Sequence, residues 1–216
     1  MQILLADDHP LFLAGMRHIL SQLDETVQVH CAEAGEAALQ LLRGEIEFDL
    51  LLLDLGLPDT DGLGLLHILR EEAIMVPVIV VSASENLHQI RAALAAGALG
   101  FIPKSHHAVQ MLDAIHEVLD EGEIYLPDDI RAHIDRLVAN DEIPASQGIT
   151  SRQRQVLSLL AQGLANKQIA QRLNLTEHTV KAHLGALFQI LKVSNRTECA
   201  QKAQRLGLLA SDTPLN

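Results

Sequence analysis

The first 120 residues alternate between short apolar runs and longer stretches in which apolar residues recur every three or four positions. The short runs are typical of buried strands, and the longer stretches are typical of amphipathic helices. Parallel strands need long crossover connections, which are usually helices. The alternation therefore predicts an α/β doubly wound, five-stranded parallel sheet with helices on both faces. The expected strands are Gln2–Ala6, Val27–Cys31, Leu50–Leu53, Val78–Val81 and Gly100–Ile102.

A change of pattern after residue 120 indicates a second folding unit. Residues 121–147 contain glycine, proline and one short helical pattern at residues 128–139, which is typical of a linker. Beyond it the patterns are helical only, at residues 151–162, 166–173, 176–191 and 195–206. We therefore expect an α/β domain of residues 1–120, a linker of residues 121–147 with a short helix, and an all-α domain of residues 148–216.

Charge separates the two halves of the chain. Residues 1–142 carry 7 Lys/Arg and 25 Asp/Glu, a net charge of −18, whereas residues 143–216 carry 9 and 3, a net charge of +6. The basic half is the candidate for contact with nucleic acid. The longest apolar stretch, Ala73–Val81, is too short to cross a bilayer, and the N-terminus has no basic segment typical of a secretory signal. We expect a cytoplasmic protein with no membrane partner and two reduced cysteines.

Polar side chains follow four of the five expected strands. Asp7 and Asp8 follow the first strand, Asp54 the third, Ser82 the fourth, and Lys104 the fifth. In an open parallel sheet, ligands bind outside the carboxyl ends of the strands, so these side chains form the candidate site. Carboxylates brought together at one edge repel each other unless a cation joins them, and an all-oxygen ligand set favours Mg²⁺.

The residues beyond the carboxylates indicate phosphoryl transfer. A lysine ammonium and a serine hydroxyl suit the oxygens of a phosphoryl group, and an aspartate can form an acyl phosphate. We assign Asp54 as the nucleophile, with Lys104 and Ser82 in the same catalytic site, because Asp54 alone follows the central apolar run. A phosphohydrolase with an aspartyl-phosphate intermediate is the enzymatic alternative, but it needs a carboxylate two residues after the nucleophile, where this chain has Gly56.

These residues resemble the receiver domain of two-component response regulators. The segments that carry the resemblance are Asp7-Asp8, Asp54 to Gly62, Ser82 to Ser84, and Gly97 to Lys104. The resemblance implies a flavodoxin-like fold over about residues 1–120 and a histidine kinase that phosphorylates Asp54. No enzymatic activity is expected beyond the receiver's own phosphoryl transfer.

The same resemblance assigns the remaining roles in the acidic half. Mg²⁺ would be held by Asp8, Asp54 and the backbone carbonyl of Gly56, with Asp7 assisting. Ser82 and Phe101 match the hydroxyl and aromatic switch positions of the family, and Lys104 matches its lysine.

The basic half contains a helix, a tight turn and a second helix between residues 166 and 191. The face of the second helix opposite its apolar stripe carries short or polar side chains, which would let the helix approach base edges in the major groove. Basic side chains and backbone N–H groups at the helix starts would contact phosphates. The candidate DNA-binding residues are Asn166, Lys167, Thr176, Glu177, His178, Thr179, Lys181, Ala182, Gly185 and Arg196.

Residues 148–210 resemble the LuxR-type helix-turn-helix domain, through the segments Ile149 to Leu160, Gly163 to Ala170, Thr179 to His183 and Val193 to Thr197. With a receiver, this resemblance implies the NarL/FixJ family, whose members bind promoter DNA as dimers and control transcription. RNA polymerase is then a candidate partner. The last helix would form the dimer contact through a stripe of Cys199, Ala203 and Leu206. A phosphorylation-dependent adaptor whose helical domain binds another protein is the alternative.

Overall fold

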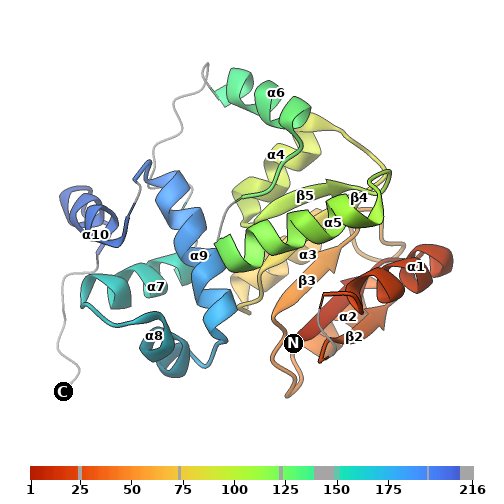
Figure 1. Ribbon diagram of the computed structural model, residues 1–216, viewed down its shortest axis with the longest axis horizontal. Coiled ribbons are helices and arrows are strands. Elements are labelled where there is room, and N and C mark those ends of the chain that lie inside the picture. Colours follow the sequence, from red (N-terminus) through yellow and green to blue (C-terminus); the bar gives the residue numbers. More distant parts are fainter. Residues whose placement is uncertain are drawn as a thin grey trace.

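The computed structural model describes residues 1–23, 26–72, 74–121, 124–138, 149, 151–193 and 195–209 (Figure 1). The strands are β1 (Gln2–Ala6), β2 (Gln28–Ala32), β3 (Leu50–Leu53), β4 (Val78–Ser82) and β5 (Gly100–Pro103). The helices of the α/β domain and the following segment are α1 (Pro10–Leu20), α2 (Gly35–Leu42), α3 (Gly62–Glu71), α4 (Leu87–Ala96), α5 (Ala108–His116), the π-helical turn η1 (Glu117–Glu121) and α6 (Asp128–Val138). The helices of the second unit are α7 (Ser151–Ala161), α8 (Asn166–Leu173), α9 (Glu177–Ile190) and α10 (Arg196–Arg205).

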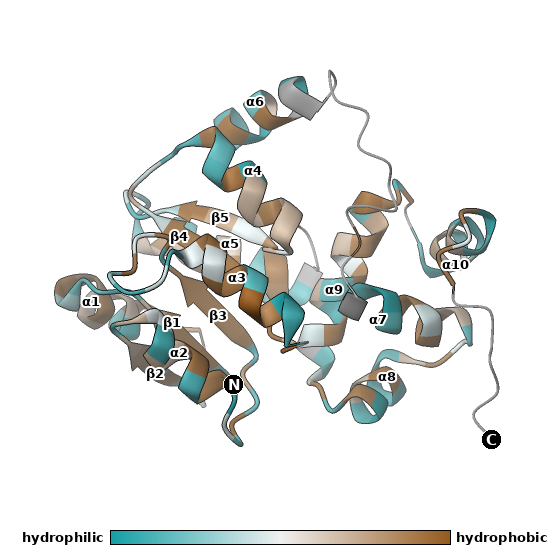
Figure 2. Ribbon diagram, turned by 180° about the vertical axis from the view of Figure 1, so that it is seen from behind, coloured by the Kyte–Doolittle hydropathy of each residue, from teal (hydrophilic) through white to brown (hydrophobic). Residues whose placement is uncertain are grey.

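The five strands form one parallel sheet in the order β2-β1-β3-β4-β5. The predicted doubly wound fold is thereby confirmed, with each strand within one residue of its expected bounds. All four residues of the central strand β3 are fully buried, which explains why its sequence is leucine throughout rather than alternating. The strands are accordingly among the most hydrophobic parts of the molecule in Figure 2.

Helices cover both faces of the sheet and divide its core into two clusters. Apolar residues of α2, α3, α4 and α6 pack on one face, and apolar residues of α1 and α5 pack on the other. Successive side chains of a strand point to opposite faces. Phe101 of β5 therefore lies in the first cluster, whereas the next residue, Ile102, lies in the second.

Helices α7 to α10 enclose a separate core, as expected for an all-α domain. Two of their starts are capped by side chains. Thr176 Oγ1 accepts a hydrogen bond from Thr179 N at 3.1 Å, and Asn195 Oδ1 accepts one from Glu198 N at 2.9 Å. The tight turn between α8 and α9 places Asn174 in the left-handed region, with φ of 56°.

The helical domain packs against the α/β domain through α9. Ala182 and Ala186 of α9 are fully buried and belong to the core cluster that contains α1 and α5, next to η1. From the other side, Met75 of the α/β domain packs on the core of the helical domain, and Asn174 donates a side-chain hydrogen bond to Glu47. Figure 1 shows α9 lying against the end of α5. The two domains are therefore in direct contact along α9.

Within the described residues, no helix is both long enough and apolar enough to span a membrane.

The two cysteines differ in burial, and we expect them to differ in reactivity. Cys199 is fully buried in the helical domain, and burial raises the pKa of its thiol to about 11, so the reactive thiolate is scarce at neutral pH. Cys31 is half-buried on β2, where Arg17 Nη2 lies 3.2 Å from its Sγ. Iodoacetamide should therefore alkylate Cys31 first in the native protein, as followed by peptide mass spectrometry. Equal rates at the two thiols before unfolding would contradict this packing.

Candidate functional site

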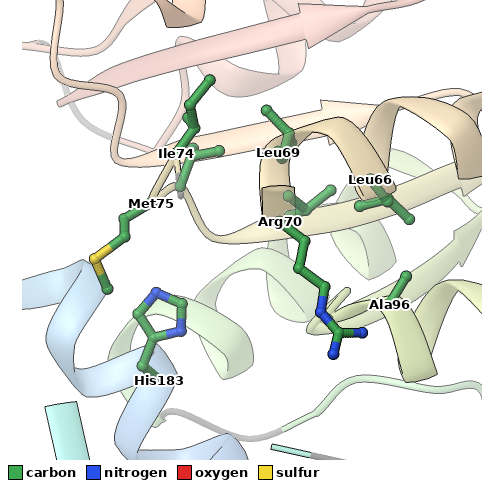
Figure 3. Close-up of a pocket in the computed structure, with 10 residues that line it drawn as sticks. Leu66, Leu69, Arg70, Ile74, Met75, Ala96 and His183 are labelled. Carbon is green, nitrogen blue, oxygen red and sulfur yellow. The ribbon is translucent and has the colours of Figure 1, made fainter. Parts of the chain in front are cut away.

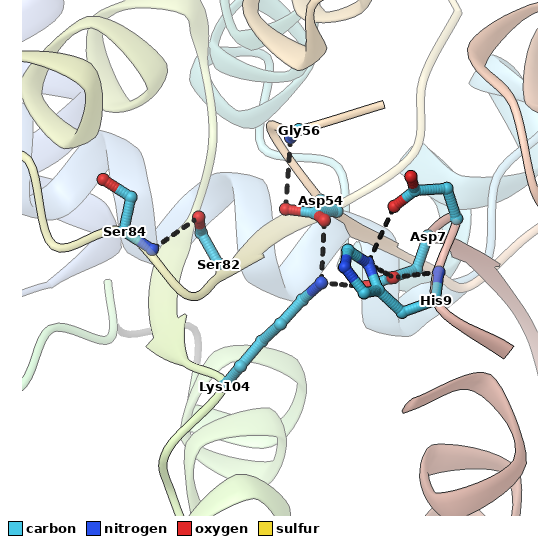
Figure 4. A network of polar contacts seen from close by, with 8 residues as sticks. Asp7, His9, Asp54, Gly56, Ser82, Ser84 and Lys104 are labelled. Atoms are coloured by element: carbon cyan, nitrogen blue, oxygen red, sulfur yellow. Dashed lines mark hydrogen bonds and ion pairs between the residues drawn. The ribbon is translucent and has the colours of Figure 1, made fainter. Parts of the chain in front are cut away.

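The carboxyl ends of four strands bring the predicted site residues together (Figure 4). Asp7 follows β1, Asp54 follows β3, Ser82 ends β4, and Lys104 follows β5. Backbone hydrogen bonds fix their spacing, because Asp54 N donates to Ala6 O at 2.9 Å and Lys104 N donates to Ser82 O at 2.9 Å. Asp7, Asp54 and Ser82 are each at most 5% exposed. The sheet edge therefore holds two buried carboxylates, a hydroxyl and an ammonium in one place.

Lys104 is the cation that balances the two buried carboxylates. Its Nζ donates a hydrogen bond to Asp54 Oδ2 at 2.7 Å and forms an ion pair with Asp7 Oδ2 at 2.6 Å. Burial lowers the pKa of Lys104, but the hydrogen bonds and charges of Asp54 and Asp7 outweigh it and raise the pKa overall. The ammonium also lies 4.8 Å from the ring centroid of Phe12, a cation–π contact that was not predicted from the sequence. Lys104 is thus positively charged at neutral pH and held on three sides.

An open cavity of about 590 Å³ gives access to Asp54. It is lined by the reactive side chains Asp54, Ser82 and Lys104 and by the less polar Leu11 and Phe12 of α1. Gly56 N donates to Asp54 Oδ1 at 3.2 Å, and Ser84 N donates to Ser82 Oγ at 3.1 Å. Ser82 Oγ is the acceptor in that bond, and its O–H is a donor that a ligand in the cavity could use. The nucleophile, the hydroxyl and the ammonium predicted from the sequence therefore line one cavity.

A second charged cluster adjoins Asp54 and includes His9, which was not among the predicted site residues. His9 Nδ1 lies 3.0 Å from Asp7 Oδ1 and 2.7 Å from Asp8 Oδ1. One ligand atom from each of Asp7, Asp8, His9 and Asp54 falls within 4.8 Å of the others. Three carboxylates within this distance suit a hard divalent cation that prefers oxygen ligands. Position directly after the acidic pair is the only sequence signal that could have pointed to His9.

The loop after Asp54 depends on a close backbone contact at Gly62. A Cβ atom at Gly62 would lie 2.6 Å from Leu55 Cα and 2.7 Å from Asp54 O, closer than any side chain permits. The loop is also tied to α2, because the Asp59 carboxylate accepts hydrogen bonds from Gly35 N at 2.7 Å and Glu36 N at 2.9 Å. These two bonds lower the pKa of Asp59. The loop therefore fixes the backbone on the carboxyl side of Asp54, a role of Asp59 and Gly62 that was not predicted from the sequence.

The second candidate surface is the helix-turn-helix of α8 and α9, whose predicted DNA face is partly covered. Glu177 and Lys181 are exposed, but Ala182 is 1% exposed because it packs on the α/β domain. Thr179 is also buried, at the capped start of α9. Lys167 is exposed, while Asn166, Thr176 and Gly185 are half-buried. The side chain of His178 lies outside the described residues.

A small cavity lies between the two domains beside α9 (Figure 3). His183 of α9 and Met75 of the α/β domain line it together with Arg70 of α3. His183 is only 7% exposed. His183, which lies between the two alanines in the sequence, therefore also faces the α/β domain across this cavity, a role that was not predicted from the sequence.

Comparison with known proteins assigns both halves of the chain. Residues 3–116 match the family described as response regulator receiver domain, and residues 147–203 match the bacterial regulatory proteins of the luxR family. The chain is 38% identical over 216 residues to the glycerol metabolism activator of Pseudomonas putida, covering 97% of each chain. It is 35% identical over 202 residues to the nitrate/nitrite response regulator protein NarL of Escherichia coli K12, covering 92% of each.

The chain belongs to the two-component response regulators with a LuxR-type DNA-binding domain. It is thus a DNA-binding transcriptional regulator of the NarL type.

Solved structures agree with the fold of this response regulator. Its chain aligns with RcsB of Salmonella enterica serovar Typhimurium bound to promoter P1flhDC, with a TM-score of 0.58, 24% identity and coverage of 94% of this chain and 97% of RcsB. A CheY-like receiver domain protein of Methanospirillum hungatei aligns with 56% of this chain and 94% of its own, with 31% identity and a TM-score of 0.51. The first likeness supports the fold alone.

Two predicted groups of the DNA-binding domain lie elsewhere than expected. Arg196 donates from Nη1 to Asn166 Oδ1 at 3.3 Å and from Nη2 to Leu164 O, so in this conformation it fixes the start of α8 rather than extending toward phosphates. Cys199 and Ala203 have no exposed area because they pack into their own domain's core. The prediction that they form a dimer stripe is wrong for this packing, and only Leu206, 48% exposed, is accessible.

Replacing Gly62 with alanine should destabilise the response regulator. The added methyl group would overlap the backbone of Asp54 and Leu55, and forced overlap in a packed region costs roughly 1–3 kcal/mol. Urea unfolding of the Gly62→Ala variant measures the loss. The matched control is Gly64→Ala, whose Cβ would meet only Thr60 Cγ2 at 3.8 Å and which should be at least as stable as the wild type. Equal stability of the two variants would show that the backbone contact at Gly62 is unimportant.

Proposed function

We propose that a histidine kinase transfers a phosphoryl group to Asp54 and that this transfer releases α9 from the receiver domain to bind promoter DNA. The observation that carries the proposal is the side-chain set of one cavity, in which the Asp54 carboxylate is 2.7 Å from Lys104 Nζ and Ser82 lines the same space. A buried carboxylate that faces a cavity beside a fixed ammonium suits nucleophilic attack on a phosphoryl group.

The phosphoryl transfer is a single displacement. A carboxylate oxygen of Asp54 attacks the phosphorus of a phosphohistidine, an O–P bond forms, and the P–N bond breaks with its electron pair left on the imidazole nitrogen. Lys104 then replaces its hydrogen bond to Asp54 Oδ2 with a hydrogen bond to a phosphoryl oxygen. The Ser82 hydroxyl donates to a second phosphoryl oxygen. The charged ammonium is the strongest of these contacts, because hydrogen bonds from a charged donor are roughly twice as strong as neutral ones.

Mg²⁺ fits the same site. We propose that Asp8, Asp54 and the backbone carbonyl of Gly56 hold it, with Asp7 assisting, because the ligand atoms of Asp7, Asp8 and Asp54 already lie within 4.8 Å of one another. When bound, the ion would neutralise charge on the phosphoryl oxygens. The Asp7 and Asp54 carboxylates, which both pair with Lys104 in this structure, would then share their negative charge between the lysine and the ion.

The contact between domains supports inhibition of DNA binding before phosphorylation. Ala182 lies on the predicted DNA face of α9 and is buried against the receiver domain. The major groove admits a helix only when its base-facing side is free. DNA and the receiver therefore compete for α9, and the net charges of −18 and +6 favour the closed arrangement further.

Release of α9 would let two copies bind DNA together. Recognition helices of helix-turn-helix dimers lie about one DNA turn apart, roughly 34 Å. We propose such a dimer on promoter DNA, with RNA polymerase as the next partner, and a division into a receiver of residues 1–120, a linker of residues 121–147 and a DNA-binding domain of residues 148–216. We propose that the protein is cytoplasmic, because it would reach both the phosphohistidine of the kinase and the promoter DNA in that compartment.

The substitution Asp54→Asn tests the phosphorylation site. Incubation with acetyl phosphate and Mg²⁺ should add one phosphoryl group to the wild type and none to the variant, because an amide cannot act as the attacking carboxylate. Intact-protein mass spectrometry measures the product. Asp61→Asn is the matched control, since Asp61 caps α3 on the surface and should leave labelling unchanged. Labelling of the Asp54 variant to the wild-type level would reject the assignment.

A charge at the domain contact tests the inhibition of DNA binding. Met75→Asp places a carboxylate against the core of the DNA-binding domain without touching the face of α9 that reads DNA. Unphosphorylated protein should then bind its promoter about tenfold more tightly. We expect the charge to lower the free energy that favours the closed arrangement by about 1.4 kcal/mol, which corresponds to a factor of ten in affinity. Fluorescence anisotropy with labelled promoter DNA, at fixed salt, measures the affinity.

Two further variants make this measurement specific. Val109→Asp adds the same charge at a residue of α5 that is 68% exposed, and it should have no effect. Adding Lys181→Ala to Met75→Asp should remove about 1–3 kcal/mol of the DNA affinity, because Lys181 is the exposed cation of α9. Labelling of Asp54 with no DNA binding by any variant would instead favour a protein partner for the helical domain.

A further inference from the structure

The chain returns to the sheet after η1 and pairs with the outer edge of β5. Phe101 N donates to Tyr125 O at 2.9 Å, and Tyr125 N donates to Leu99 O at 3.2 Å. Tyr125 thereby forms a parallel bridge with Gly100. Because β5 is an edge strand in the sheet, these bonds satisfy backbone groups that would otherwise face solvent or another chain. The first residues after the receiver's last helix are therefore part of its sheet.

Gly100 allows this close approach. A Cβ atom at Gly100 would lie 3.1 Å from Tyr125 O and 3.3 Å from Tyr125 Cβ, so a larger residue would require Tyr125 to shift by a few tenths of an ångström. Tyr125 is half-buried, and its ring contacts the His106 ring edge-on at 6.4 Å between centroids. Tyr125 is thus closely packed through both its backbone and its side chain.

Helix α6 fastens the same segment to the receiver core. Leu126, Ile130 and Ile134 are each at most 8% exposed and belong to the apolar cluster that contains Phe101. Arg131 Nη2 donates to Ile124 O at 2.8 Å, which ties α6 to the residue that precedes the bridge. Figure 1 shows α6 beside α4 at the edge of the molecule. Residues 124–134 are therefore attached to β5 and α4 at several points.

Strand β5 connects this attachment to the phosphorylation site. On one side it pairs with β4 in a register that matches Val80 with Phe101 and Ser82 with Pro103, and Lys104 N donates to Ser82 O at 2.9 Å. On the other side it holds Tyr125. Lys104 directly follows β5, so a movement of Lys104 toward a phosphoryl group would move the end of β5, four residues after Gly100.

We propose that residues 124–134 form a latch, which holds the linker on the unphosphorylated receiver. Phosphorylation at Asp54 opens this latch by displacing β5 from Tyr125. The proposal rests on the proposed function, because it needs phosphorylation at Asp54. The latch has two states, closed and open. The phosphorylation site and the linker both shift the equilibrium between these states, and coupling between distant sites requires an element of this kind. Opening frees the segment between the domains, and α9 leaves the receiver.

Amide hydrogen exchange on the full chain tests the latch directly. In the unphosphorylated protein, the amides of Phe101 and Tyr125 should both be protected, because each donates within the bridge. With acetyl phosphate and Mg²⁺, both should exchange at least tenfold faster. The internal control is Leu99 N, which donates to Val78 O at 2.7 Å on the opposite edge of the same strand and should keep its protection.

The outcomes separate the latch from the function on which it rests. If Asp54 is not labelled, the proposed function fails. If Asp54 is labelled and DNA binding increases while Phe101 and Tyr125 remain protected, the latch is wrong and the proposed function stands. Loss of protection at Leu99 together with the other two would also overturn the latch, because it would indicate opening of the whole strand.

Two variants test the latch without a phosphoryl group. Gly100→Ala forces a methyl group against Tyr125, and Arg131→Ala removes the bond to Ile124 O at the surface. Each should raise the DNA affinity of unphosphorylated protein severalfold and speed exchange at Tyr125. Gly15→Ala is the matched control, because a Cβ there meets nothing within 4 Å and both properties should stay at wild-type values. Urea unfolding verifies that the variants fold, and a folded Arg131→Ala protein with unchanged exchange and affinity would reject the latch.

Discussion

The ion pairs of Lys104 are the interaction on which the site depends. Asp7 and Asp54 are almost completely buried, and two carboxylates so close together would be unstable without a cation between them. The carboxylates come from β1 and β3, whereas the lysine comes from the far end of the domain sequence, after β5. The site is therefore complete only when the sheet has formed from its first strand to its last. Under the proposed function, a phosphoryl group would give Lys104 a further anionic partner in this charge balance.

The receiver and the DNA-binding domain meet through the smallest side chains of α9. Ala182 and Ala186 let the helix lie close to η1, and short side chains are also what a helix needs to approach base edges. Under the proposed function, the same surface property would serve two partners that exclude each other. The larger side chains Met75 and His183 lie beside this strip and line the small cavity between the domains.

The sheet and the position of the candidate site could be predicted from the sequence because both follow local rules. Strand residues alternate or are uniformly apolar according to their burial, and parallel strands bring their carboxyl ends to one edge, so Asp54, Ser82 and Lys104 had to meet. His9 and Phe12 escaped prediction because their contacts with Asp7 and Lys104 depend on where α1 begins relative to the strand ends.

Packing between elements accounts for the predictions that failed. Cys199 and Ala203 form a stripe of small residues, but a small stripe suits a domain's own core as well as a dimer contact, and only the neighbouring helices decide between them. The phosphate contact of Arg196 stays a prediction, and in this structure Arg196 donates to the carbonyl of Leu164 and the side chain of Asn166. The contact of α9 with the receiver involves residues far apart in the sequence, and no local pattern indicates it.

The burial of α9 has a thermodynamic consequence for the receiver itself. Coupling between two binding events is reciprocal, so if phosphorylation favours DNA binding by releasing α9, DNA must favour the phosphorylated state by the same factor. A promoter that draws Ala182 and Ala186 away from the receiver is then an effector of the receiver as well as its target. Among promoters that share one pool of regulator, those that bind most tightly would hold their regulator in the phosphorylated state longest.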